Sequence, residues 1–165
     1  MRKILLFVLL AVLSGIFAAQ NQAAENYRVV DGDSLEKGTL RIRLEGIDAP
    51  EYLQDCYDAH QEKYRCGLKS MDYLQELTAG KIFCKALSRD RYGRQLSECF
   101  NAEGQSINRQ MVVSGWAVAY GDMYQSEEQT ARANKSGIWQ GKFMRPELYR
   151  AINRAKDKRN KIKKM

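Results

Sequence analysis

The alternation of apolar and polar residues predicts a strand over residues 41–48, which is half buried. Its inward-facing apolar positions are Ile42 and Leu44. Pro50 blocks continuation of the strand, because it lacks the backbone N–H that a ladder needs. The turn around this proline therefore gathers two carboxylates, Asp48 and Glu51, at one strand end. A purely structural strand end has no need for that grouping.

Further runs of the same kind predict about five strands in total. Residues 27–35 form an apolar run interrupted by Asp31-Gly32-Asp33, where the glycine permits a bend or bulge. Lys37-Gly38 is typical of a hairpin turn that leads into the 41–48 strand. Residues 81–87 and 95–100 then flank the segment DRYGR, which predicts a second hairpin.

Three stretches have the three- and four-residue apolar spacing of amphipathic helices or the polar residues that begin one. The first covers residues 64–80 and ends at a glycine. The second, over residues 106–113, begins with a serine that can cap it. The third, over residues 126–137, has a possible capping box in Ser126 and Gln129. The fold class predicted is thus mostly β with helices (α+β), with about three helices packed on the sheet.

The N-terminal residues predict export. Arg2 and Lys3 precede an uncharged apolar run over residues 4–19, which is typical of a secretory signal peptide. We expect residues 1–24 to be this signal, with cleavage near Ala18–Ala24. A retained membrane anchor is the alternative, although the run is short for a bilayer span. The mature protein is expected in the periplasm or the medium, without stable membrane association and as a monomer.

Length and composition indicate one domain and a charged tail. A chain of 165 residues with 44% hydrophobic residues has room for one domain with a true core, which we place at residues 25–145. The formal charge of +7 does not come from this domain but mainly from the tail, because residues 150–165 contain eight basic residues and one acidic residue. The tail, residues 146–165, is either a solvated and partly helical terminus or an arm that binds nucleic acid.

Four cysteines in an exported protein favour disulfides. Cys84 and Cys99 flank the DRYGR turn almost symmetrically, so the predicted hairpin brings them close. That leaves Cys56 to pair with Cys66. A zinc site is the competing interpretation, but the chain has no CxxC or HxxxH pair to support it. His60 is the only histidine, which also disfavours paired-histidine ribonuclease chemistry.

Five stretches taken in chain order resemble the staphylococcal nuclease family, over roughly residues 27–140. These are VVDGDSL (29–35), RIRLEGIDAPE (41–51), DRYGRQL (90–96), INRQMVVSGWAVAY (107–120) and ARANKSGIW (131–139). The first three hold every charged group that the family's site would require. The resemblance implies an OB-fold, a five-stranded barrel with helices packed around it.

The resemblance also implies a calcium site. Asp33 and Asp48 match the metal-binding carboxylates, and the backbone carbonyl of Ala49 matches a further ligand. The family's best-known member has threonine at the position of Ala49, but a main-chain oxygen is preserved whatever the side chain. Carboxylate and carbonyl oxygens are the ligands that a hard cation such as Ca²⁺ prefers. Asp31 is interpreted as an ordinary turn residue.

By the same resemblance, Arg43 and Arg94 match two phosphate-binding arginines, and Glu51 matches the carboxylate usually proposed as general base. Such a site implies hydrolysis of DNA and RNA with little sequence specificity, to products that end in 3′-phosphates. Single-stranded or frayed substrate is expected, since an OB surface holds splayed bases readily. Tyr120 and Tyr124 are candidates to stack on bases, with core packing as the alternative.

Two other interpretations compete with this one. Arg43 could merely pair with a neighbouring glutamate, and Arg94 could be an ordinary turn charge. A non-catalytic OB-type module that binds nucleic acid and carries a basic tail is the rival function. A degenerate relative of that kind would be expected to lose Glu51 or one of the arginines, and this chain keeps all three.

Overall fold

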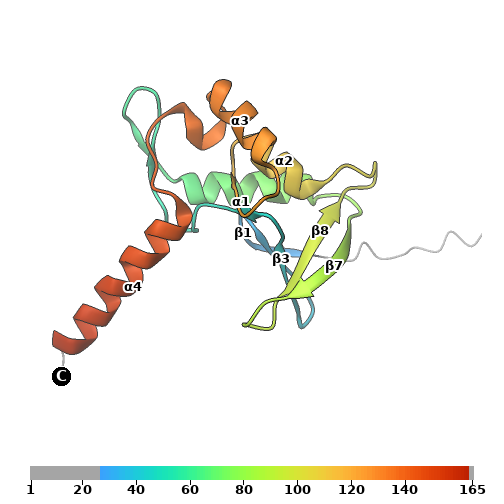
Figure 1. The fold of residues 1–165 in the computed structure, drawn as a ribbon, viewed down its shortest axis with the longest axis horizontal. Coiled ribbons are helices and arrows are strands. Elements are labelled where there is room, and N and C mark those ends of the chain that lie inside the picture. Colours follow the sequence, from blue (N-terminus) through green and yellow to red (C-terminus); the bar gives the residue numbers. More distant parts are fainter. Residues whose placement is uncertain (1–26, 164–165) are drawn as a thin grey trace, which may run out of the picture.

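A mixed five-stranded sheet is the centre of the computed structural model, which describes residues 27–163 (Figure 1). The proposed signal peptide lies outside the described residues. The strand order is β1-β2-β3-β8-β7, in which only β3 and β8 pair in parallel. The strands are β1 (Arg28–Asp31), β2 (Ser34–Lys37), β3 (Leu40–Leu44), β7 (Phe83–Arg89) and β8 (Gln95–Phe100). The expected class, α+β with an OB-like sheet, is confirmed.

Two short strand pairs lie outside the five-stranded sheet. They pair β4 (Ile47–Asp48) with β9 (Val118–Ala119), and β5 (Cys56–Tyr57) with β6 (Lys63–Tyr64). The first ladder sets Asp48 directly opposite Val118. The strand end that carries Asp48 is therefore held by residues far along the chain.

The DGD segment is a tight hairpin turn rather than an interruption within one strand. β1 and β2 are antiparallel with Asp31 opposite Ser34, so Gly32 and Asp33 alone connect them. A side chain at Gly32 would overlap the hydroxyl of Ser70 in the first helix. That close approach fixes the turn, and with it Asp33, against the helix.

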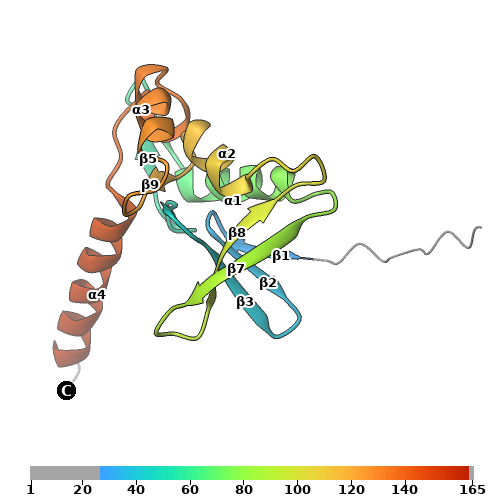
Figure 2. The ribbon, with the colours of Figure 1, turned by 45° about the vertical axis from the view of Figure 1, so that its right-hand side comes forward.

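Helices α1, α2 and α3 pack at one end of the sheet (Figure 2). The helices are α1 (Cys66–Leu77), α2 (Ile107–Val113), α3 (Gln125–Ala133), the short 3-10 helix η1 (Gly137–Gln140) and α4 (Pro146–Lys163). Ser106 caps α2 as expected, since its Oγ accepts a hydrogen bond from the backbone N–H of Arg109. The number of packed helices, three, is also as expected.

The capping box predicted for α3 is wrong. The helix begins one residue earlier, after Tyr124, whose backbone is left-handed with φ of 58°. The Ser126 hydroxyl donates to the neighbouring Glu127 carboxylate instead of capping the helix. The start of α3 is set by tertiary packing, because Tyr124 lies against the core and its hydroxyl donates to Glu98.

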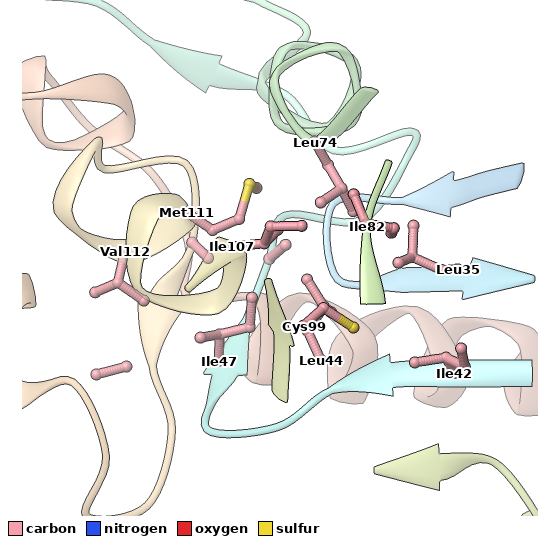
Figure 3. Packing of buried hydrophobic residues seen from close by; sticks show 13 residues of the cluster. Leu35, Ile42, Leu44, Ile47, Leu74, Ile82, Cys99, Ile107, Met111 and Val112 are labelled. Carbon is pink, nitrogen blue, oxygen red and sulfur yellow. The ribbon is translucent and has the colours of Figure 1, made fainter. Parts of the chain in front are cut away.

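The core lies between the sheet and helices α1 and α2 (Figure 3). Ile42 and Leu44 are 1% and 0% exposed, so the alternation predicted for this strand is confirmed. Leu74 from α1 and Met111 from α2 are buried in the same cluster. Because Ile42 and Leu44 must face inward, the intervening Arg43 points to the other face of β3.

Both expected cysteine pairs form disulfides. Cys84 and Cys99 are register partners on β7 and β8, and Cys56 on β5 is joined to Cys66 at the start of α1. The competing zinc interpretation is therefore wrong. The second bridge anchors the N-terminus of α1 beside the loop that carries Glu51.

The basic tail is an 18-residue helix, α4, that projects away from the sheet (Figure 1). It contacts the body through its first turns, where Pro146 is buried and the Tyr149 hydroxyl donates to the carbonyl of Leu53. Proline suits a first helical turn, since the N–H it lacks has no partner there. Nowhere in residues 27–163 is there a helix with the length and apolar character required to cross a membrane.

A first prediction concerns the contact that positions the Glu51 loop. Gly67, in the first turn of α1, has no room for a side chain, because an added Cβ would overlap the carbonyl of Glu51. We expect Gly67→Ala to lower the free energy of unfolding by about 1–3 kcal/mol, despite alanine's better helix propensity. Urea unfolding measures the change.

Gly80→Ala is the matched control, since an added Cβ there meets nothing within 4 Å. Equal stability of the two variants would contradict the proposed steric role of Gly67.

Candidate active site

A single arginine connects three segments of the chain at the edge of the sheet. Arg43 on β3 donates from Nη1 to Asp33 Oδ1 at 2.8 Å and from Nη2 to Asp48 Oδ1 at 2.9 Å. Asp33 lies in the β1–β2 turn and Asp48 in β4. The structure therefore brings these three predicted site residues together, and Arg43 does not pair with a neighbouring glutamate.

Asp33 is almost fully enclosed, with 3% of its surface exposed. Its carboxylate accepts hydrogen bonds from the Ser34 hydroxyl at 2.9 Å and from the backbone N–H of Ala49 at 3.0 Å. Burial and the nearby Asp31 nevertheless raise its pKa to about 7, against the lowering effect of Arg43. A carboxylate with this pKa is short of compensating positive charge.

Asp31 has the role expected of a turn residue. Its Oδ1 accepts a hydrogen bond from the backbone N–H of Asp33 at 3.1 Å. This is the short-range bond by which an aspartate stabilises a tight turn.

Glu51 and Asp48 pair with the same side chain, that of Arg150 in the tail helix. Arg150 on α4 donates from Nη1 to Glu51 Oε1 and to Asp48 Oδ1, both at 2.8 Å. Its Nη2 donates to Asp48 Oδ2 at 2.9 Å. Arg150 was not predicted from the sequence, because it belongs to no motif and lies among other basic residues of the tail.

Arg94 is held by its own hairpin turn. Its Nε donates to Asp90 Oδ2 at 2.8 Å, and Asp90 Oδ1 accepts from the backbone N–H groups of Tyr92 and Arg94. The turn itself is tied to β3, because Arg41 donates to the carbonyl of Tyr92 at 2.9 Å. Arg94 thus has the turn contact of an ordinary hairpin charge, yet it lines the same cleft as Arg43 and Glu51.

This cleft has a volume of about 600 Å³ and is open to solvent. Six arginines line it: Arg41, Arg43, Arg91, Arg94, Arg150 and Arg154. Tyr92 and Tyr120 also line it, and Tyr120 is 55% exposed. Tyr124 is not among the lining residues, because it packs on the core, as the alternative interpretation expected. Of the two stacking candidates, only Tyr120 lines the cleft.

The carboxylates of the site fit a hard divalent cation by their chemistry. Asp33 and Asp48 converge on one guanidinium, and buried Asp33 lacks sufficient positive charge. Within residues 27–163, no three His, Cys, Asp or Glu side chains gather as a metal site. A cation held by Asp33 and Asp48 would therefore take its remaining ligands from other oxygens, such as the main-chain oxygen of Ala49. Arg43 and Arg150 both bond Asp48 Oδ1, and a cation at the site would replace part of that pairing.

Comparisons with known proteins point to one family. Residues 41–141 match the family model described as staphylococcal nuclease homologue. The succinoglycan biosynthesis protein ExoI of Rhizobium meliloti (strain 1021) is 41% identical over 117 residues, a match that covers 67% of this chain and 61% of that protein. The chain thus spans less than two thirds of this relative.

Two further relatives have nuclease names. An uncharacterized endonuclease of Escherichia coli O157:H7 is 36% identical over 123 residues, which cover 68% of this chain and 73% of that protein. The micrococcal nuclease of Shigella flexneri is 31% identical over 135 residues, or 70% of this chain and 72% of that protein. These relatives support a nuclease function.

A second prediction follows from the pKa of Asp33. Because its folded-state pKa, about 7, is above the ordinary 3.8, the folded protein binds this proton more tightly than the unfolded chain does. The stabilisation that comes from protonated Asp33 is complete below about pH 4 and is lost as the pH rises towards 7. In a chelator, wild type should therefore lose more stability between pH 5 and pH 8 than Asp33→Asn, as measured by urea unfolding.

The matched control is Asp72→Asn, which changes an exposed aspartate on α1. This control should follow the wild-type pH profile. Parallel profiles for wild type and Asp33→Asn would show that Asp33 does not titrate in this range.

Proposed function

The chain belongs to the staphylococcal nuclease family, and we propose that it is a metal-dependent endonuclease that hydrolyses DNA and RNA with little sequence specificity. The observation that carries this proposal is the pair of ion pairs from Arg43 to Asp33 and Asp48, next to Glu51 in an arginine-lined cleft. Phosphodiesters are anions, and arginine binds their oxygens in a planar, bidentate manner. The nuclease names of two relatives support the same activity.

The arginines of the cleft would bind and polarise the scissile phosphate. Arg43 uses two of its N–H groups for Asp33 and Asp48, and a guanidinium has five. Arg94 lies in the turn that leads into β8, the strand paired with β3, and lines the same cleft. Together they would stabilise the extra negative charge that develops on a five-coordinate phosphorus, which is the main demand of this reaction.

Glu51 is placed to act as the general base. Its side chain is 35% exposed, so water can reach it, and Arg150 bonds only one of its two oxygens. In the proposed reaction a water oxygen attacks phosphorus, and its proton passes to Glu51. The bond to the 5′ oxygen breaks, and this oxygen takes up a proton from solvent, so the products are a 3′-phosphate and a 5′-hydroxyl. Calcium, held by Asp33, Asp48 and the carbonyl of Ala49, would supply positive charge to a phosphate oxygen and to the water.

We also propose that the protein acts after export, as a monomer, in the periplasm or the medium. The two disulfides support an oxidising compartment. Single-stranded or frayed nucleic acid is the proposed substrate, because exposed Tyr120 beside the cleft can stack on an unpaired base.

A non-catalytic nucleic-acid-binding module remains the second candidate. It is favoured by one observation, the pairing of Arg150 with both Glu51 and Asp48, which engages the proposed base and a proposed metal ligand. Binding and cleavage measured on the same variants separate the two functions.

A third prediction tests metal dependence. Purified mature protein with calcium should degrade single-stranded DNA, and a chelator should abolish the cleavage until calcium is restored. Calcium should also raise the midpoint of thermal unfolding, because a ligand of the folded state stabilises it. Asp48→Asn should lose both effects. Intact single-stranded DNA after a long incubation with calcium would refute the proposed enzyme.

A fourth prediction tests the roles of Glu51 and Arg94. Glu51→Gln and Arg94→Ala should each lower the cleavage rate by about 10²–10³, as expected when a transition-state contact is removed. Glu51→Gln should still bind single-stranded DNA, since glutamine removes a negative charge from the cleft. Gel-based cleavage and fluorescence anisotropy measure the two properties.

Glu103→Gln, at an exposed glutamate outside the cleft, is the control and should match wild type. If all of these proteins cleave equally, the active site lies elsewhere.

A further inference from the structure

The contact between α4 and the site is not explained by the family match. The matched region ends at residue 141, whereas α4 begins at Pro146. Yet Arg150 forms three hydrogen bonds of 2.8–2.9 Å with Asp48 and Glu51, residues about 100 positions away in the chain. A tail that served only as a solvated terminus would not need an arginine in the middle of this site.

Basic residues of α4 continue along the side of the helix that faces the cleft. Arg150 and Arg154 both line the cleft and are four residues apart, so they lie on one face of the helix. With 3.6 residues per turn, Lys158 and Lys161 continue that face for about 16 Å beyond Arg150. Lys158 and Lys161 are exposed.

The opposite wall of the cleft is the β7–β8 hairpin. Arg91, Tyr92 and Arg94 from its turn line the cleft, and Figure 2 shows this hairpin and α4 extending from the body on either side. Six arginines face three acidic lining residues, Asp31, Glu51 and Glu147. The cleft therefore has an excess of positive charge on two walls, which matches a polyanion that passes between them.

We propose that α4 forms the second wall of the substrate cleft, where Arg150 and Arg154 bind backbone phosphates of single-stranded nucleic acid next to the phosphate that is cleaved. This inference rests on the proposed function. Arg150 is 28% exposed and already pairs with anions, so substrate binding exchanges carboxylate partners for phosphate oxygens. Such an exchange leaves no guanidinium unpaired, and it releases Glu51 for its role as base.

The test compares three charge-matched variants: Arg150→Gln, Arg154→Gln and Arg159→Gln. Arg159 is nine residues beyond Arg150, which places it on the opposite face of the helix, where it is exposed. Affinity is measured by fluorescence anisotropy with a labelled twelve-nucleotide single-stranded DNA, in chelator, over a range of salt concentrations. Cleavage of the same DNA in calcium gives KM and kcat.

Arg150→Gln should raise Kd about tenfold or more, as expected for the loss of a charge-assisted contact. It should also lower the slope of log Kd against log salt concentration by about 0.7, the value for one phosphate contact on a single strand. Arg154→Gln should shift both quantities in the same direction, KM should rise with them, and Arg159→Gln should stay within about twofold of wild type. Arg150→Lys, which keeps the charge but not the bidentate fork, should be intermediate.

Either of two changes in the Arg150→Gln variant would overturn the proposal. Equal weakening by Arg150→Gln and Arg159→Gln would show a diffuse attraction to the tail rather than a wall of the cleft. Tighter binding or faster cleavage by Arg150→Gln would show that Arg150 blocks the site. Should Arg150→Gln unfold, exposed Arg154, for which the same outcomes are expected, decides the question against Arg159.

The outcome for wild type separates this proposal from the proposed function. If wild type cleaves and neither Arg150→Gln nor Arg154→Gln differs from it, the second wall is refuted and the nuclease proposal stands. If wild type neither binds nor cleaves single-stranded DNA, both proposals fail.

Discussion

The site depends on the two ion pairs that Arg43 forms, one with Asp33 and one with Asp48. Both aspartates are nearly inaccessible to water, and they come from a hairpin turn and a separate short strand. Removing one partner of a buried ion pair leaves an uncompensated charge, at a cost of about 3–5 kcal/mol. The same contact therefore orders three chain segments and gathers the charged groups that the proposed chemistry requires.

The charge of this cluster is not balanced by Arg43 alone. Three carboxylates, Asp33, Asp48 and Glu51, meet two guanidiniums, those of Arg43 and Arg150. Burial and the nearby Asp31 raise the pKa of Asp33, Asp48 adds to the effect, and Arg43 opposes it. The divalent cation that we propose would supply the missing positive charge at this cluster.

The fold supplies the rigid support for these charges. The β1–β2 turn and the Glu51 loop both lie against α1, with glycines at the contact points where a side chain would overlap. The Cys56–Cys66 disulfide fixes the start of α1 beside the same loop, and β9 holds the strand that ends in Asp48. Among the helices of residues 27–163, α4 projects from the packed body, and its contacts at Tyr149 and Arg150 attach its first turns to the site.

Local patterns in the sequence determined much of this protein. Alternation placed Ile42 and Leu44 in the core and Arg43 opposite them, and near-symmetric spacing paired Cys84 with Cys99. Turn residues located the hairpins at residues 37–38 and 90–94 but not the one at residues 31–33. These features depend on neighbouring residues, for which strand and turn geometry fixes the outcome. The order of the charged motifs also indicated which residues would meet.

The tertiary structure alone decided what depends on distant segments. The left-handed start of α3 overrode a plausible capping box, because core packing of Tyr124 sets the backbone there, and the same packing removed Tyr124 from the cleft. Arg150 could not be recognised among the basic residues of the tail, since its partners are about 100 residues away. The periodicity of side chains indicates which helix or strand a residue belongs to. Its partner on another element is determined only when the whole chain packs.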